Sequence, residues 1–165
     1  MNRDKLPATN AVRVLREHGV AYSDHPYVYE ARGGTEVSAR ELGVPEHQVV
    51  KTLVMEDDSG QPMIVLMHGD REVSTRNLAR HLGVKSVAPC APAVADRHSG
   101  YQVGGTSPFG TRKAMPVYMQ STIAALPRIY VNGGRRGYLV GLAPADAVRV
   151  LKPVLVDIAT APSQD

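Results

Sequence analysis

Apolar side chains recur along the chain at the two spacings that distinguish helices from strands. In the first such stretch Ala8, Val12 and Leu15 fall at helical intervals, and Thr9 or Asn10 can cap the helix. Similar patterns, bounded by capping residues and by glycine or proline, predict further short helices near residues 35–43, 74–83, 93–97 and 144–152. Each helix is expected to cover a core with one face.

Longer apolar runs predict the strands. Residues 49–55 and 63–67 are apolar on both faces apart from Lys51 and Thr52, and the turn signal at 57–60 joins them into a hairpin. Shorter strands are expected within 21–29, 85–87, 114–119, 128–131, 138–140 and 154–157.

The order of these elements indicates the fold class. Helices and strands do not alternate regularly, so the pattern favours an α+β domain over a doubly wound sheet. We expect one mixed β-sheet, curled or barrel-like, with helices around it. Residues 1–158 would form this single domain, and residues 159–165 a loose tail.

Composition then narrows the class of protein. At 165 residues with 43% hydrophobic and 21% charged side chains, the chain can bury one core, and it has no apolar run long enough for a membrane helix. The N-terminus lacks the apolar core of a secretory signal, so we expect a cytoplasmic protein. A net charge of +3 and a pI near 9.1 indicate mild attraction to polyanions. One Phe and no Trp disfavour base-by-base reading through aromatic stacking.

Cysteine and histidine content argues against a metal centre. Cys90 is the single cysteine, which excludes an internal disulfide and a cysteine-based metal cluster. Its neighbours are alanines and prolines, which offer no base or cation to activate the thiol. The six histidines are scattered without ligand spacing, so we expect no metal and no other cofactor.

Residues 100–110 hold four glycines, one proline and three hydroxyl side chains, with neither helical nor strand period. Gly104 and Gly105 let a ligand approach the main chain, whose amides can converge on an oxyanion or phosphate, and Thr106 and Ser107 add hydroxyls beside them. A plain connection between two strands is the commoner use of such residues. The pattern by itself leaves both interpretations open.

Two cationic positions raise the same choice. Lys51 lies in an otherwise apolar strand, where its ammonium either reaches solvent at the strand end or points into a cleft. Arg135 and Arg136 lie in a second glycine loop, residues 132–137. Guanidinium groups there suit phosphate, although an exposed arginine turn that keeps a hairpin soluble is commoner.

Four pieces occur in a fixed order: Tyr27 on an early strand, the strand that carries Lys51, the loop 99–110 and the hairpin 130–137. Together they resemble the YbaK/EbsC family, and the resemblance runs from about residue 10 to 157. It implies a bacterial trans-editing hydrolase that removes cysteine from mischarged proline tRNA and works beside prolyl-tRNA synthetase. The implied fold is the mixed barrel of that synthetase's inserted editing domain.

The resemblance also implies roles for single residues. Lys51 matches the family's required lysine and Tyr27 its pocket tyrosine. The substrate-facing loop corresponds to Gly104, Gly105 and Ser107, with Thr106 between them, and the neighbouring hairpin corresponds to Asn132, Gly133 and Gly134. We therefore expect the amides of Gly104 and Gly105 to contact the oxyanion and Lys51 to position the ester or the terminal ribose and phosphate. Arg135 and Arg136 would contact tRNA phosphates.

One departure concerns the substrate's α-ammonium. Members often carry an acidic residue after the arginine hairpin, whereas this chain has Leu139 and Gly141 there. The histidine motif of the related alanine-removing proteins is also missing near residues 130–140, which favours cysteine over alanine.

The absence of a Ser–His pair agrees with the family's substrate-assisted chemistry, in which the cysteine thiol attacks its own ester carbonyl. Cys-tRNA(Cys) is a second potential substrate. Alternatives are an Ala- or Ser-tRNA deacylase of the same superfamily and a non-catalytic module that binds tRNA or a nucleotide. An anion-binding domain of the cell surface is disfavoured by the missing export signal.

Overall fold

The computed structural model describes residues 6–161, and these form a mixed α+β fold. The helices are α1 (Asn10–Glu17), α2 (Gly34–Leu42), α3 (Thr75–Leu82), α4 (Pro92–Ser99) and α5 (Pro144–Leu151), with 3₁₀ turns η2 (Glu46–Gln48) and η3 (Ser121–Ala125). The strands are β1 (Tyr22–Pro26), β2 (Val50–Asp57), β3 (Pro62–His68), β4 (Glu72–Val73), β5 (Val87–Pro89), β6 (Val117–Gln120), β7 (Ile129–Arg135), β8 (Tyr138–Leu142), β9 (Val154–Val156) and β10 (Ala159–Thr160). The predicted fold class is confirmed.

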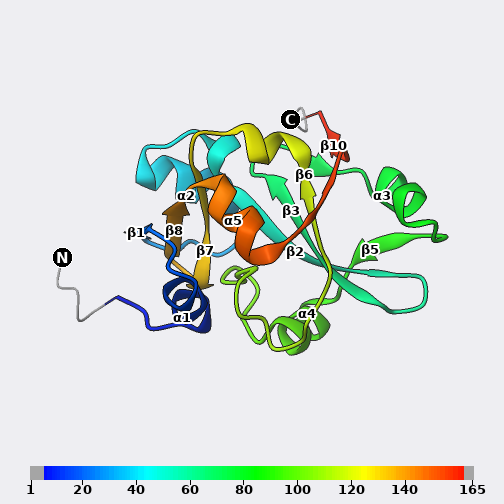
Figure 1. The fold of residues 1–165 in the computed structure, drawn as a ribbon, viewed down its shortest axis with the longest axis horizontal. Helices are drawn as coiled ribbons and strands as arrows, with labels where there is room; N and C mark the ends of the chain where they lie inside the picture. The colour runs from blue at the N-terminus through cyan, green and yellow to red at the C-terminus, as the bar shows by residue number, and fades with distance from the viewer. Residues whose placement is uncertain (1–5, 162–165) are drawn as a thin grey trace.

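Two sheets meet at β2 and β7. The larger sheet has the order β5-β2-β3-β6-β9, with antiparallel pairing around the β2–β3 hairpin and parallel pairing from β3 through β6 to β9. A second sheet, β1-β8-β7, is antiparallel. A parallel bridge between Val49 and Tyr130 connects the two sheets, and Figure 1 shows how the elements are arranged around them.

The central strand β3 is buried along its whole length, which explains its continuous apolar sequence. Its side chains alternate between two clusters: Ile64 and Leu66 pack in one, and Met63, Val65 and Met67 in the other. The first cluster is closed by residues of α1, α4 and α5, and the second by residues of α3. Figure 1 shows α3 beside β5, at the end of the molecule away from α1. No described helix is both long and apolar enough to cross a bilayer.

Two sequence predictions are corrected at the N-terminal helix and the arginine hairpin. Thr9 is the cap, so α1 begins at Asn10; Ala8 is exposed before it, and Ala11 occupies the core position instead. The predicted loop 132–137 is largely strand, because β7 continues to Arg135 through a bulge after Asn132. Only Arg136 and Gly137 connect β7 to β8.

Ordered structure also continues past residue 158. Ala159 pairs with Val73, and the Thr160 hydroxyl donates to the Glu72 carbonyl. These two residues of the predicted tail therefore form an edge strand with β4. Residues 162–165 of that tail lie outside the described residues.

Thr9 joins α1 to the arginine hairpin. Its hydroxyl oxygen accepts from the Val12 amide at 3.2 Å, and its proton goes to the Gly133 carbonyl. Thr9→Ala should lower the free energy of unfolding by about 1–2 kcal/mol, measured by urea denaturation, since the cap and the tether are both lost. The control is Thr111→Ala, which removes a local hydrogen bond to the Lys113 carbonyl. Equal losses in the two variants would contradict the tether.

Candidate functional site

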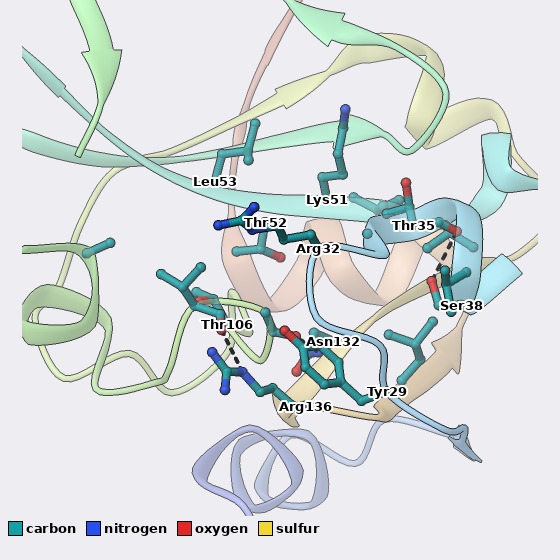
Figure 2. A pocket seen from close by; sticks show the side chains of 18 of the residues that line it. Tyr29, Arg32, Thr35, Ser38, Lys51, Thr52, Leu53, Thr106, Asn132 and Arg136 are labelled. Carbon is teal, nitrogen blue, oxygen red and sulfur yellow. Dashed lines mark hydrogen bonds between the residues drawn. The ribbon is translucent and has the colours of Figure 1, made fainter. Parts of the chain in front are cut away.

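A pocket of about 690 Å³ lies between β2, α2 and the two glycine-containing segments (Figure 2). Its walls come from segments far apart in sequence: residues 27–38, residues 49–54, the start of α4, the glycine loop and the β7–β8 hairpin. Predicted site residues that line it are Tyr27, Lys51, Gly104, Thr106, Asn132 and Arg136. Those that do not are Gly105, Ser107, Gly133, Gly134 and Arg135.

The pocket exists because β2 loses a neighbour on one side. β2 pairs with β3 along its length but with β5 only from Met55 onward, extended by one bond from the Cys90 amide to the Val54 carbonyl. On the same side the bridge to β7 is at Val49. Between these two points no described strand pairs with this side of β2. The unpaired edge of β2 therefore forms part of the pocket wall.

Thr52 also lines the pocket, although in the sequence it marks only a polar interruption of an apolar strand. Val49 bonds toward β3 and Val54 toward β5, so the alternation of backbone groups turns those of Thr52 toward the pocket side. Its Oγ1 is buried and has no hydrogen-bond partner among the described residues. A buried hydroxyl without a partner is unfavourable, which makes Thr52 a position for a ligand hydrogen bond.

Lys51 contributes to the pocket wall but directs its ammonium elsewhere. Figure 2 shows the side chain pointing away from Tyr29, Thr106 and Asn132. The Nζ donates to the Arg71 carbonyl at 2.5 Å and lies 3.3 Å from the Glu72 carboxylate. The sequence left open whether the ammonium reaches solvent at the strand end or points into a cleft. In the structure it does not point into the pocket and binds at the β3–β4 turn.

The glycine loop uses its two central glycines differently. A Cβ on Gly104 would lie 2.7 Å from the Tyr29 hydroxyl, and one on Gly105 would lie 2.6 Å from the Arg136 nitrogen. The Gly105 amide donates to the Gln102 carbonyl at 2.7 Å, so it closes a turn and is not the free oxyanion donor that was expected. Ser107 is fully buried and accepts from the Phe109 amide. Gly105 and Ser107 therefore support the loop, and Gly104 and Thr106 face the pocket.

The arginine hairpin holds this loop in place. Asn132 donates its Nδ2 to the Gly104 carbonyl at 3.2 Å, and its Oδ1 accepts from the amides of Gly134 and Arg135. Arg136 donates its Nε to the Val103 carbonyl at 2.9 Å, and its guanidinium lies 5.2 Å from the centre of the Tyr29 ring. Gly133 is required because a Cβ there would lie 2.4 Å from the Tyr138 ring.

Two further side chains that line the pocket, Tyr27 and Cys90, have raised pKa values. Burial raises the pKa of Tyr27, whose phenol is protonated at neutral pH and can donate a hydrogen bond. Burial, followed by the charge of Glu56, raises the pKa of the Cys90 thiol. Cys90 lines the pocket as a neutral thiol, which agrees with a packing role and not with that of a nucleophile.

A family model for the aminoacyl-tRNA editing domain matches residues 30–150, which includes most of the pocket wall. The chain belongs to this family. The resemblance inferred from the sequence is thereby confirmed, and the protein is an enzyme of the class that acts on the ester bond of aminoacyl-tRNA.

Other proteins similar to this editing domain point the same way. It is 29% identical over 153 residues to EbsC of Enterococcus faecalis, covering 92% of this chain and 93% of EbsC, whose name proposes a Cys-tRNA(Pro)/Cys-tRNA(Cys) deacylase. It is 33% identical over 111 residues to proline–tRNA ligase of Nitratidesulfovibrio vulgaris, covering 67% of this chain but 17% of the ligase.

Solved structures support the fold. Protein APE2540 superposes with a TM-score of 0.84 at 21% identity, covering 92% of this chain and all of that one. A structure titled as a proposed trans-editing enzyme for prolyl-tRNA synthetase superposes with a TM-score of 0.79 at 20% identity, covering 94% of this chain and 99% of that one.

Outside the pocket, His47, His68 and Asp70 form a group among the described residues whose possible metal-ligand atoms lie within 4.8 Å of one another. Each of the three already uses a polar side-chain atom within the fold. His47 contacts Asp70 at 2.8 Å, and His68 contacts the His47 carbonyl and the Thr122 hydroxyl. The two imidazoles stack with centroids 3.8 Å apart. The group joins η2 to the end of β3 and does not line the pocket.

Burial lowers the pKa of His68 below the ordinary 6.5. Below pH 6.5 the unfolded chain takes up a proton that the folded protein resists, so stability should fall with a slope of up to about 1.4 kcal/mol per pH unit. His68→Gln should flatten this dependence of the urea midpoint. A residual slope is expected from His25, whose pKa is lowered by burial as well. Replacing exposed His81 by Gln is the control, and an unchanged slope in His68→Gln would refute the assignment.

Proposed function

We propose that this editing domain acts in trans in the cytoplasm, where it deacylates Cys-tRNA(Pro), and Cys-tRNA(Cys) as a second substrate, beside prolyl-tRNA synthetase. The observation that carries the proposal is the pocket: it has apolar walls, a buried hydroxyl without a partner among residues 6–161, and a glycine loop fixed at its rim. The name of EbsC and the similarity to proline–tRNA ligases support the choice of amino acid and tRNA.

The chemistry requires placement more than an enzymatic nucleophile. The thiol sulfur of the cysteinyl ester attacks its own carbonyl carbon, the ester C–O bond breaks, and the proton from the thiol ends on the departing ribose oxygen. The product is a strained cyclic thioester, which water then opens. The Gly104 amide stabilises the oxyanion, Thr52 hydrogen-bonds the bound substrate, and the pocket holds sulfur and carbonyl within reach of each other.

Lys51 serves the substrate by leaving the Arg71 carbonyl and the Glu72 carboxylate, a rearrangement that its long flexible stem permits. Lys51→Ala should then lower kcat/KM for Cys-tRNA(Pro) by about 100-fold or more while the melting temperature stays close to wild type.

The matched control is Glu72→Gln, which removes the carboxylate near the ammonium but leaves Lys51 in place. It should retain near-normal turnover. If Glu72→Gln were as impaired as Lys51→Ala, Lys51 would act by holding the β3–β4 turn; if Lys51→Ala stayed active, Lys51 would have no part in the mechanism.

Reactivity of the substrate side chain should decide selectivity. At neutral pH a few per cent of a thiol of pKa about 8.5 is thiolate, whereas a serine hydroxyl of similar shape is essentially undissociated. The protein should therefore deacylate Cys-tRNA(Pro) about 100-fold or more faster than Ser-tRNA(Pro), measured by loss of labelled amino acid across a panel of aminoacyl-tRNAs.

Cys90→Ala is the companion variant, and it should keep full activity because its thiol is neutral and serves packing. Equal rates for the cysteine and serine esters, or an acyl group trapped on Cys90, would contradict substrate-assisted attack. No ester loss from any tRNA in the panel would instead favour a non-catalytic binding module.

A further inference from the structure

Three cationic side chains line the pocket: Arg32, Lys51 and Arg136. Lys51 binds the Arg71 carbonyl and Glu72, and Arg136 binds the Val103 carbonyl and lies over the Tyr29 ring. The guanidinium of Arg32 has no hydrogen bond and no ion pair with any of residues 6–161. Within the described pocket wall it is therefore the cation that remains available to a ligand.

The backbone places Arg32 in an unfavourable conformation. Arg32 lies in the segment between β1 and α2 and has a φ of 63°, a left-handed backbone value that residues other than glycine, asparagine and aspartate rarely adopt. Glycine is absent from this position although Gly33 and Gly34 follow directly. Figure 2 shows the side chain extending from this segment across the pocket toward β2 and Thr52. Strain of this kind concentrates at positions that contact ligands.

The charges around Arg32 are not balanced within the pocket. Glu30 is the acidic residue in the described wall, and its carboxylate pairs with Arg40 at 3.6 Å. A guanidinium forks two hydrogen bonds onto planar or tetrahedral oxyanions such as phosphate. An anionic group of a ligand would supply the negatively charged partner that the described residues do not offer to Arg32.

The proposed substrate offers one anionic group at its acceptor end. The α-ammonium is cationic, while the ester, the ribose and the adenine are neutral. The amino acid's own carboxylate is esterified, so the negative charge nearest the reacting ester is the phosphodiester on the 5′ side of the terminal adenosine.

We propose that Arg32 forms a phosphate subsite that binds the 5′-phosphate of the terminal nucleotide. The inference rests on the proposed function, because that function places the terminal adenosine in this pocket. Arg32 positions the ester by holding the nucleotide from its phosphate end and takes no part in the transfer of the proton.

Adenosine 5′-monophosphate and adenosine are probes that differ by the phosphate alone. The wild-type protein should bind the monophosphate more tightly than adenosine by calorimetry. Arg32→Gln should weaken binding of the monophosphate about tenfold or more, as expected for a lost charge-assisted hydrogen bond, and should leave adenosine unchanged.

Two other variants keep the test independent of folding. Arg32→Gly suits a φ of 63° and should be at least as stable to heat as wild type while losing the preference for the monophosphate. Arg135→Gln removes an exposed arginine outside the pocket wall, and it should reduce the salt dependence of tRNA binding without changing the affinity for the monophosphate.

Kinetics give a readout that a structural role would not reproduce. Arg32→Gln should raise KM for Cys-tRNA(Pro) with kcat retained, and it should have no effect on 3′-cysteinyl-adenosine, which lacks the phosphate. Equal binding of the two nucleoside probes by wild type, or equal weakening of both in Arg32→Gln, would overturn the subsite. If ester hydrolysis were unaffected by Arg32→Gln, only the subsite would be overturned. If Arg32 bound the monophosphate but no ester were hydrolysed, only the proposed function would be overturned.

Discussion

The contact between the glycine loop and the β7–β8 hairpin is the constraint on which the site depends. Loops rich in glycine lose much conformational entropy when they become ordered, so a fixed Gly104 needs partners outside its own loop. Asn132 and Arg136 provide them by donating to two loop carbonyls, Gly104 and Val103. Each contact joins residues about thirty positions apart. These two contacts fix the position of the loop at the rim of the pocket.

The open edge of β2 is the second structural condition. A central strand with neighbours on both sides has no free backbone groups, whereas β2 leaves its partner β5 before the pocket begins. The buried Thr52 hydroxyl, which has no hydrogen-bond partner in the part of the chain that the structure describes, lies in this interval. The same separation of strands makes room for the segment between β1 and α2, which brings Arg32 and Tyr29 over the pocket.

These features fit an enzyme that acts on an activated ester. Under the proposed function its side chains would order the substrate and stabilise charge, and the pocket contains no paired nucleophile and base within the described residues. Cys90 is present but is kept neutral by burial and by Glu56. A search for catalytic triads alone would therefore overlook this pocket, although the chain belongs to the aminoacyl-tRNA editing family.

Local sequence determined much of the fold: caps such as Thr9 and Ser74, glycine stops at Gly43 and Gly83, and the apolar runs of β2 and β3 all have short-range physical causes. The joint motifs around Lys51 and the two glycine segments were sufficient to indicate the family. The orientation of side chains and backbone amides within the pocket was decided by tertiary structure. Whether Lys51 points into the pocket, whether the Gly105 amide is free, and where Thr52 and Arg32 lie depend on strand pairing and on contacts between residues far apart in the chain. Periodicity along the sequence does not predict these orientations, because another segment of the chain decides whether each polar group has a partner.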